Sequence, residues 1–472
     1  MVFSSLPFLF FYLPVVLLIY KLTPLKLRNL FLLLASLFFY GWGEPVYILI
    51  MFLSTAVDYT HGMLVERWRS DDRKARLAVA SSVFFNLAIL VFFKYWDFIA
   101  GNVNALTGLN LPIFGIPLPI GISFYTFQTM SYTIDVYRQS APVQRNVITF
   151  GAYVTLFPQL IAGPIIQYKT VAEQLVSRTE NLEKFVSGVR RFTVGLAKKV
   201  LLANAIGELW DQALASQSLT VAGAWLGLAA YAFQIYFDFS GYSDMAIGLG
   251  RIFGFKYMEN FNLPYTARSI TDFWRRWHIS LSTFFRDYVY IPLGGNRRHR
   301  WFNLLVVWSL TGLWHGASWN FLLWGLYFFV LLVAEKPLLR YLKRWPLILR
   351  QLLTMFFVVI GWAIFYFTDF ARLGQALAAM FGFAGGGFLN EQVRILLMNN
   401  LPLLLLCILG ASALPRALGN YFGVLCAHQP GSSQGRQWVY VAVSYVFCVS
   451  VIVLSTISLV GSGFSAFLYY RF

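Results

Sequence analysis

The chain has 472 residues, of which 58% are hydrophobic, 18% are aromatic and only 12% are charged. An ordinary soluble domain carries about 25% charged residues, so this chain has too few polar side chains to cover a water-soluble fold. The same numbers exclude disordered tails and disulfide-rich secreted modules. We therefore expect an all-α polytopic membrane protein that forms a single integral-membrane domain over residues 1–472.

Apolar runs that are long enough, or nearly long enough, to cross a bilayer occur throughout the chain. We expect about 11 transmembrane helices, drawn from the approximate runs 5–20, 29–43, 46–64, 77–99, 117–135, 192–214, 221–243, 302–314, 317–335, 351–368, 394–413 and 437–460. The first run has no basic residue before it and no small-residue cleavage site, so it is interpreted as a retained span. The run 147–167 is broken by Pro158, Gly163 and Pro164, which favours a re-entrant segment.

The basic residues predict the orientation in the membrane. Lys and Arg number 37 against 20 Asp and Glu, a net charge of +17, and they lie mainly in short stretches between the apolar runs. The basic stretches 66–76, 178–199 and 336–350 are expected in the cytoplasm, and the uncharged stretch 100–112 is expected outside. Alternating the spans between these anchors places both termini on the outer side, so residues 461–472 would form an extracytoplasmic tail.

Residues 251–300 form the longest stretch that is not an expected span. They include nine basic and three acidic residues among many aromatic ones. Helical spacing of four apolar residues predicts an amphipathic helix on the cytoplasmic side: Trp274, Trp277, Leu281 and Phe284. Arg275 and Arg286 would share another sector of that helix. These residue types suit an interfacial anchoring helix and a substrate-binding surface equally well.

Two further places put ionisable residues in apolar surroundings. His315 lies beside the small residues Gly312 and Gly316, and an intramembrane histidine is either functional or packed against a neighbouring carbonyl. Asp238 and Asp244 interrupt an apolar run; buried carboxylates need partners, and Arg251 or the basic 274–286 helix would be that partner. These carboxylates fit either a structural salt bridge or a functional role.

Several catalytic signatures do not occur. The sequence has no G-x-S-x-G motif, no P-loop, no G-x-G-x-x-G motif and no histidine pair with metal-ligand spacing, so no metal is expected. This pattern argues against an ATP-driven pump and a metalloprotease.

Two long motifs resemble the membrane-bound O-acyltransferase family, in particular its bacterial branch that O-acetylates exopolysaccharides such as alginate. They are DFWRRWHISLSTFFRDYVYIPLGGN at 272–296 and LWHGASW at 313–319. The resemblance extends through the segments 40–44, 119–128, 157–165 and 237–244 and covers nearly the whole chain. It implies helices around a central funnel and a catalytic pair at His278 and His315.

The resemblance also implies acetyl-CoA as the donor, whose phosphates and adenine suit a surface of Arg and Trp. The residues expected to bind the donor or to line the funnel are Trp274, Arg275, Arg276, Trp277, Arg286, Asp287, Asp238, Ser240, Asp244 and Asn296. His315 would act as general base, and His278 would orient the thioester or stabilise the oxyanion.

The C-terminal residues Phe467, Tyr469 and Phe472 are similar to the tail of a small protein of teichoic-acid D-alanylation systems, whose Tyr carries the acyl group. Tyr469 is therefore expected to be an acyl relay, although an interfacial aromatic belt would have the same residues.

The predicted function is transfer of acetyl groups across a bacterial inner membrane to an extracytoplasmic SGNH-type acetyltransferase that modifies an exported polysaccharide, with alginate favoured. The alternatives are the same chemistry on cellulose, another glycan or another acyl group, a proton-coupled transporter that uses His315 and Asp238, and a non-catalytic scaffold.

Overall fold

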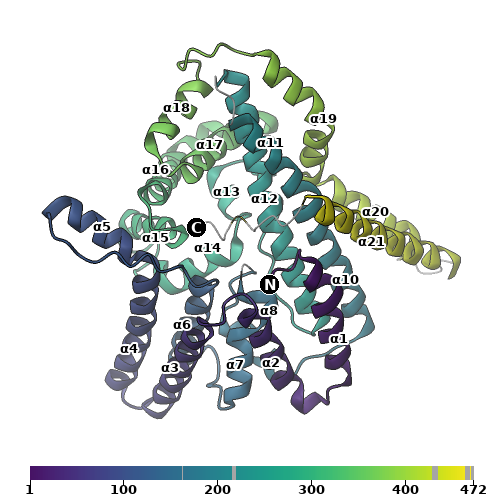
Figure 1. Cartoon of the computed structure of the whole chain (residues 1–472). Helices are drawn as coiled ribbons and strands as arrows, with labels where there is room; N and C mark the ends of the chain where they lie inside the picture. Colours follow the sequence, from purple (N-terminus) through teal and green to yellow (C-terminus); the bar gives the residue numbers. More distant parts are fainter. Residues whose placement is uncertain (162, 215–218, 428–433, 463–467, 469–472) are drawn as a thin grey trace. The chain divides into compact units, whose positions relative to one another are not determined.

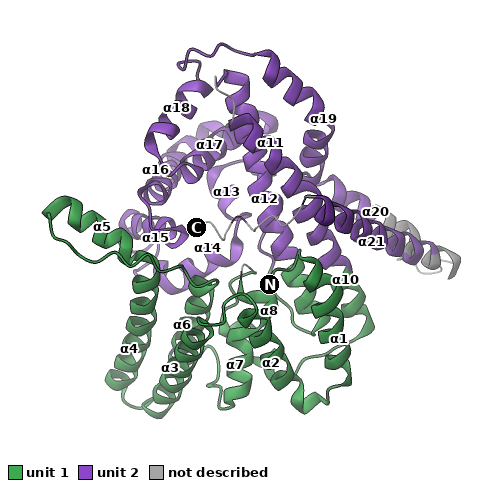
Figure 2. Cartoon of the chain, viewed as in Figure 1, with its two compact units in different colours: residues 1–189, 245–258, 472 green, residues 190–244, 259–471 purple. Residues whose placement is uncertain are grey.

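The computed structural model describes residues 1–161, 163–214, 219–427, 434–462 and 468, and every regular element in these residues is a helix. Two compact units are distinguished, one formed by residues 1–189 and 245–258 and the other by residues 190–244 and 259–471 (Figure 2). The helices α10 (Leu182–Ala197) and α12 (Val221–Ile252) each contribute residues to both units.

Unit 1 contains the helices of the N-terminal part of the chain (Figure 1). They are η1 (Phe8–Tyr12), α1 (Leu13–Leu22), η2 (Leu25–Leu27), α2 (Arg28–Gly41), α3 (Ile48–Arg67), α4 (Asp72–Leu90), η3 (Val91–Tyr95), α5 (Trp96–Thr107), α6 (Ile122–Tyr137), α7 (Val147–Thr155), α8 (Phe157–Leu160) and α9 (Tyr168–Val176).

A polar cluster joins three of these helices inside unit 1. The buried carboxylate of Asp58 on α3 accepts hydrogen bonds from Ser82 and Asn86 on α4, at 2.5 and 2.7 Å, and from Thr133 on α6 at 3.1 Å. Because an unsatisfied carboxylate in an apolar interior is very costly, these donors hold the three helices in one register.

The predicted break in residues 147–167 is present. Helix α7 ends at Thr155, the short α8 follows, and the chain is irregular before α9 begins at Tyr168. The Tyr153 hydroxyl donates to the Ile166 carbonyl at 2.9 Å, and the Gln159 side-chain amide donates to the Tyr153 carbonyl at 2.6 Å. Side chains thus satisfy carbonyls around the irregular backbone, as buried non-helical segments require; whether the segment is re-entrant stays a prediction.

Unit 2 contains the remaining helices. They are η4 (Lys198–Ala203), α11 (Asn204–Leu214), η5 (Pro264–Thr266), α13 (Ile270–Trp274), α14 (Ile279–Phe285), η6 (Arg286–Tyr290), α15 (Arg300–His315), α16 (Trp319–Leu342), α17 (Leu347–Tyr366), α18 (Phe370–Met380), α19 (Glu391–Ala411), α20 (Leu414–Ala427) and α21 (Gln434–Ser462).

The adjacent predicted runs 302–314 and 317–335 correspond to α15 and α16, which pack at backbone contact. A Cβ atom added to Gly312 would meet the backbone carbonyl of Phe321, and one added to Gly325 would meet that of Trp308. Small residues permit this close approach between apolar helices. The crossing holds the end of α15, and with it His315, against α16.

The continuous amphipathic helix predicted around residues 274–284 is wrong. Two short helices, α13 and α14, occupy this region, and the chain turns between them because His278 has a left-handed backbone (φ 45°, ψ 54°). Helix α13 is anchored at its start by Glu335 of α16, whose carboxylate accepts the backbone N–H groups of Ile270 and Thr271 at 2.5 and 3.0 Å. Both short helices bury apolar residues, so the spacing of apolar residues over the two helices together resembles that of one longer amphipathic helix.

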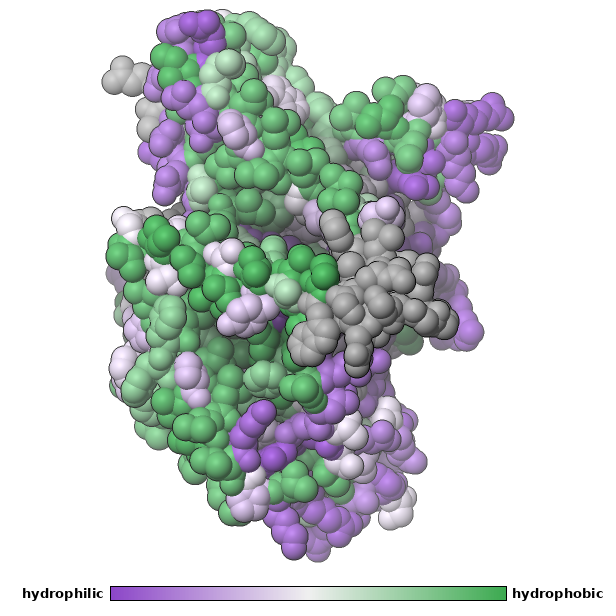
Figure 3. Space-filling model, turned by 90° about the vertical axis from the view of Figure 1, so that its right-hand side faces the viewer, coloured by the Kyte–Doolittle hydropathy of each residue, from purple (hydrophilic) through white to green (hydrophobic). Residues whose placement is uncertain are grey.

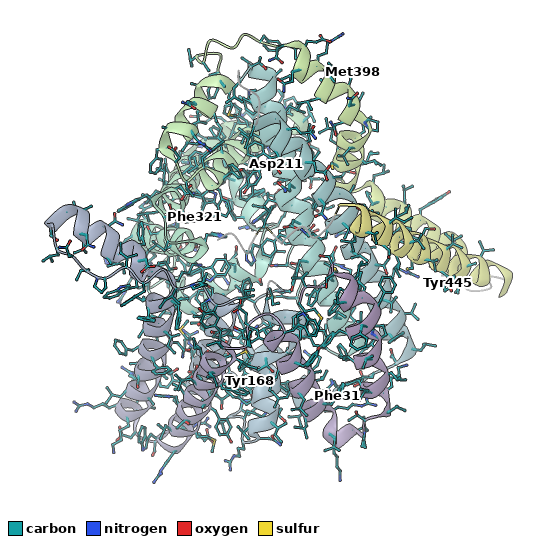
Figure 4. All side chains as sticks on the ribbon, viewed as in Figure 1. Phe31, Tyr168, Asp211, Phe321, Met398 and Tyr445 are labelled. Atoms are coloured by element: carbon teal, nitrogen blue, oxygen red, sulfur yellow. The ribbon has the colours of Figure 1, made fainter. Side chains whose placement is uncertain are left out.

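Six helical segments among the described residues are long and apolar enough to cross a membrane, so the chain is a multi-pass membrane protein, while the count of 11 spans stays a prediction. They are 48–67, 72–107, 319–342, 347–366, 391–411 and 441–461. Hydrophobic side chains form broad areas on the face shown in Figure 3. Met398 on α19 and Tyr445 on α21 are exposed and point outward (Figure 4). Apolar residues in such positions suit contact with lipid rather than water.

Candidate active site

Unit 2 contains an open cavity of about 280 Å³. Its walls come from α13, α14, η6 and α15, with one residue from α16. The lining residues are Thr271, Trp274, Arg275, Trp277, His278, Leu281, Ser282, Phe285, Arg286, Tyr290, Leu304, Val307, Trp308, Thr311, His315 and Leu332. The cavity therefore contains both predicted catalytic histidines, in largely apolar walls with cationic side chains, which is typical of small-molecule sites.

His278 precedes α14 and is 1% exposed. Its positive φ is rare for a residue other than glycine and costs about 1–2 kcal/mol. The Nδ1 atom lies 3.2 Å from Oδ1 of Asn260 and 3.4 Å from Oγ of Ser280, and the ring packs edge-on against Phe239 with centroids 4.6 Å apart. The strained backbone therefore turns the imidazole into the cavity wall, where polar neighbours hold it.

Asn260 determines which nitrogen of His278 carries the proton. Its Oδ1 also accepts from the backbone N–H and the hydroxyl of Ser280, at 3.2 and 2.9 Å, while its Nδ2 donates to Ser243 at 3.1 Å. An amide oxygen only accepts, so Nδ1 of His278 is the donor and Nε2 is the acceptor atom. Burial lowers the pKa of His278 to about 3, so the ring is neutral at physiological pH.

His315 is the last residue of α15 and is 6% exposed. Its ring is surrounded by aromatic rings, with centroids 5.0 Å from Trp324, 5.1 Å from Phe365 and 6.5 Å from Phe321. Phe321 lies at the start of α16 (Figure 4). Trp314 is in ring contact with both histidines, at 5.1 Å from His315 and 5.8 Å from His278. The side chain of Trp314 thus contacts both histidines.

Six predicted site residues line the cavity: Trp274, Arg275, Trp277, His278, Arg286 and His315. Both arginines are exposed. Arg286 also forms an ion pair with Asp287 at 2.9 Å. Exposed guanidinium groups beside an apolar cavity suit a ligand with an anionic head and a less polar arm.

Three other predicted donor-binding residues of this stretch are absent from the described lining. Arg276 pairs with Asp272 at 2.8 Å, Asp287 pairs with Arg286, and Asn296 accepts a hydrogen bond from the Tyr290 hydroxyl at 2.8 Å. Arg276 lies in the turn that follows α13, whereas Asp287 and Asn296 each contact a residue that does line the cavity.

The predicted partners of Asp238 and Asp244 are wrong. Neither Arg251 nor the 274–286 stretch supplies the cation; the cations come from α10 and η4. Lys199 pairs with Asp238 at 2.6 Å, and Arg191 and Lys198 pair with Asp244 at 2.6 and 2.7 Å. Asp238, Asp244 and the buried Ser240 are absent from the described lining of the cavity.

Tyr469, the predicted relay, lies outside the described residues, as do Phe467 and Phe472. The preceding residue, Leu468, is described and is 7% exposed. Its backbone N–H donates to Oδ2 of Asp238 at 2.8 Å.

Sequence reasoning missed Asn260, Ser280 and Trp314, which contact the predicted catalytic pair. No periodic pattern or motif marks Asn260, which lies in an irregular segment 18 residues before His278. Among the described residues, no group of three or more His, Cys, Asp or Glu side chains is arranged to hold a metal ion.

The sequence model of the membrane-bound O-acyltransferase family matches residues 31–375, and the chain belongs to this family. It is therefore an acyltransferase, and membership favours enzymatic function over the transporter and scaffold alternatives.

Similar proteins of known name include a probable alginate O-acetylase, AlgI, of Pseudomonas syringae pv. tomato, which is 44% identical over 84% of this chain and 77% of its own length. The peptidoglycan O-acetyltransferase of Helicobacter pylori is 34% identical over 82% of this chain and 80% of its own length. The teichoic acid D-alanyltransferase of Bacillus subtilis is 28% identical over 58% of this chain and 73% of its own length.

Proposed function

We propose that this enzyme takes acetyl groups from cytosolic acetyl-CoA and passes them across a bacterial inner membrane for O-acetylation of an exported polysaccharide. The observation that carries the proposal is the cavity that contains both His278 and His315 and has Arg275 and Arg286 in its wall. The phosphates of coenzyme A would lie against the arginines, and the pantetheine arm would enter the apolar interior toward the histidines.

In the proposed reaction, the oxygen of an acceptor hydroxyl attacks the thioester carbonyl. His315 takes the hydroxyl proton as general base. A new C–O ester bond forms, the C–S bond breaks, and the proton passes from His315 to the departing coenzyme A thiolate. The aromatic rings around His315 exclude water, which would otherwise hydrolyse the thioester.

The role of His278 follows from its hydrogen bonds. With Nδ1 donating to Asn260, neutral His278 presents an acceptor at Nε2 and has no second N–H for an oxyanion. We therefore favour orientation of the donor, by accepting a hydrogen bond from one of its N–H or O–H groups, over oxyanion stabilisation.

The first test measures coenzyme A release and acetyl transfer by purified protein with radiolabelled acetyl-CoA. His315→Ala should lower the rate by at least 100-fold, the scale of a lost general base. His61→Gln is the matched control, because His61 on α3 bonds the Val57 carbonyl of its own helix and is remote in sequence from the cavity elements. Full activity of His315→Ala would disprove the catalytic assignment.

We further propose that Tyr469 is the first acceptor. Its phenol would take the acetyl group as an ester and present it outside. Leu468, which bonds Asp238 in the interior of unit 2, supports this role, because it places the residue before Tyr469 inside the protein.

Labelling of the tail tests this relay. Tyr469→Phe removes only the phenolic oxygen and should abolish acetyl labelling of the C-terminal peptide, measured by mass spectrometry. Tyr470→Phe removes the same atom one residue later and should leave labelling intact. Normal acetylation of the polysaccharide in a Tyr469→Phe strain would rule the relay out.

We propose alginate as the polysaccharide, because similarity to alginate O-acetylases reaches 44% identity, against 34% for the peptidoglycan enzyme. An extracytoplasmic SGNH-type acetyltransferase would be the partner that places the group on the polymer. Acetyl analysis of alginate and peptidoglycan from a deletion strain decides the acceptor, since only the true acceptor should lose its ester. Co-purification of an SGNH-type protein with the tagged enzyme tests the partner.

A further inference from the structure

The Lys199–Asp238 ion pair lies in the interior of unit 2. Lys199 is 3% exposed and Asp238 is 1% exposed, and their Nζ and Oδ1 atoms are 2.6 Å apart. Taking two charges out of water costs several kcal/mol per ion before their attraction is counted. A buried pair of this kind is therefore weak evidence of stabilisation and calls for another explanation.

The local fold brings the two residues together. Lys199 lies in the π-helical turn η4, where the helix widens, and such turns are common at functional sites. Gly241 of α12 faces this turn so closely that an added Cβ would lie 2.8 Å from the Gly195 carbonyl and 3.0 Å from the Lys199 nitrogen. The close approach of the two backbones lets the Lys199 side chain reach Asp238.

A second ion pair on the same two elements provides a comparison. Asp244 uses both carboxylate oxygens for cations, since Oδ1 accepts from Arg191 at 2.8 Å and Oδ2 from Lys198 at 2.7 Å. Asp244 therefore links α12 to α10 and η4, and both of its oxygens are used by cations in this link.

Asp238 differs because only one of its two oxygens faces a cation. Oδ1 faces Lys199, whereas Oδ2 accepts a hydrogen bond of 2.8 Å from the backbone N–H of Leu468. Leu468 is 230 residues away from Asp238 in the sequence. A backbone N–H is present whatever the side chain, so this contact holds the chain itself, and a charged acceptor makes it stronger than an ordinary hydrogen bond.

We propose that Lys199 and Asp238 form an anchor that holds the C-terminal tail in the protein interior. The inference rests on the proposed function in one respect: by fixing Leu468, the anchor positions Tyr469 for acyl transfer. Lys199 orients the Asp238 carboxylate, and Asp238 binds the tail at Leu468. Both are positioning residues and take no part in bond making.

Trimming of the purified full-length protein by carboxypeptidase Y, followed by intact mass spectrometry, tests the anchor without acetyl-CoA. In the wild type, digestion should stop with Leu468 retained. The double variant Lys199→Met and Asp238→Leu removes both charges together, which leaves no unpaired ion, and should lose Leu468 at least tenfold faster.

The matched control is the double variant Lys198→Met and Asp244→Leu, which removes the neighbouring pair and leaves Arg191 paired with Glu259. It should be trimmed as the wild type is. Asp238→Asn is a milder second variant: it replaces one of the two carboxylate oxygens with an NH2 group, so in either orientation of the amide a donor faces Lys199 or the Leu468 N–H, and this variant should also release the tail. Monodisperse gel filtration identifies variants that have kept their fold.

Wild-type trimming of the folded Asp238→Asn and Lys199→Met/Asp238→Leu proteins would overturn the anchor. Release of the tail in both control and test variants would overturn it too, because the effect would then be general loosening. If the tail is released and transfer continues, the anchor stands and the relay fails. If Tyr469→Phe abolishes transfer while the tail stays held in both test variants, the relay stands and the anchor fails.

Discussion

His278 combines a left-handed backbone with an imidazole that is 1% exposed. Both features cost free energy, and such strain persists where the surroundings over-determine the conformation. Asn260 and Ser280 supply the hydrogen bonds that hold the ring, and Phe239 and Trp314 pack against it. Asn260 thus sets the tautomer of His278.

The buried His278 makes stability depend on pH. Burial lowers its pKa to about 3 in the folded protein, against about 6.5 in an unfolded chain. Below pH 6.5 the unfolded chain binds a proton that the folded protein does not, so its contribution to stability is complete above pH 6.5 and is lost as the pH falls toward 3. The slope is at most about 1.4 kcal/mol per pH unit.

Thermal unfolding in detergent between pH 7.5 and 5 measures this effect. The wild type should become less stable on acidification, and His278→Gln should show a shallower dependence because it has no titrating ring. Parallel pH curves for the two proteins would contradict the assignment of a neutral, buried His278.

At the scale of elements, the α15–α16 crossing determines where His315 lies. Gly312 is one helical turn before His315, and it faces the Phe321 carbonyl without room for a side chain. Trp324 and Phe321 of α16 then contact the imidazole. The backbones of the two helices must therefore touch for the histidine to meet its aromatic surroundings.

Gly312→Ala should separate these helices. Overpacking at a rigid contact costs about 1–3 kcal/mol, and displacement of His315 should lower acetyl transfer more than the loss of stability explains. Gly374→Ala on α18 is the control, because no atom lies within 4 Å of the added methyl group; this change should stabilise the helix by up to about 1 kcal/mol. Equal unfolding temperatures of Gly312→Ala and wild type would refute the close crossing.

At the scale of the whole molecule, we expect the distribution of charge to set the orientation in the membrane. Truncation after Arg344 should leave an alkaline phosphatase fusion in the cytoplasm and inactive, because basic loops stay inside. Truncation after Gly385 adds α17, a helix apolar enough to span, and should give an active, extracytoplasmic fusion. The opposite pair of activities would invert the predicted topology.

The sequence by itself determined the class of the protein and its membrane character, and it singled out the two histidines that the structure places in one cavity. Hydrophobicity is set by local composition, and the family motifs at 272–296 and 313–319 are continuous in the chain, so neither depends on folding. Helix α15 (Arg300–His315) also covers the predicted apolar run 302–314.

Only the tertiary structure decided how these residues are held. A broken helix at His278, the caps from Asn260 and Glu335, and the cations of Asp238 and Asp244 depend on contacts between segments distant in sequence. The spacing of apolar residues predicts which side of a segment is buried. It does not predict where the backbone turns or which distant side chain contacts the segment. The low share of charged residues, 12%, thus indicates a membrane protein. Only the three-dimensional contacts distinguish the arginines that line the cavity from the buried ion pair that binds Leu468.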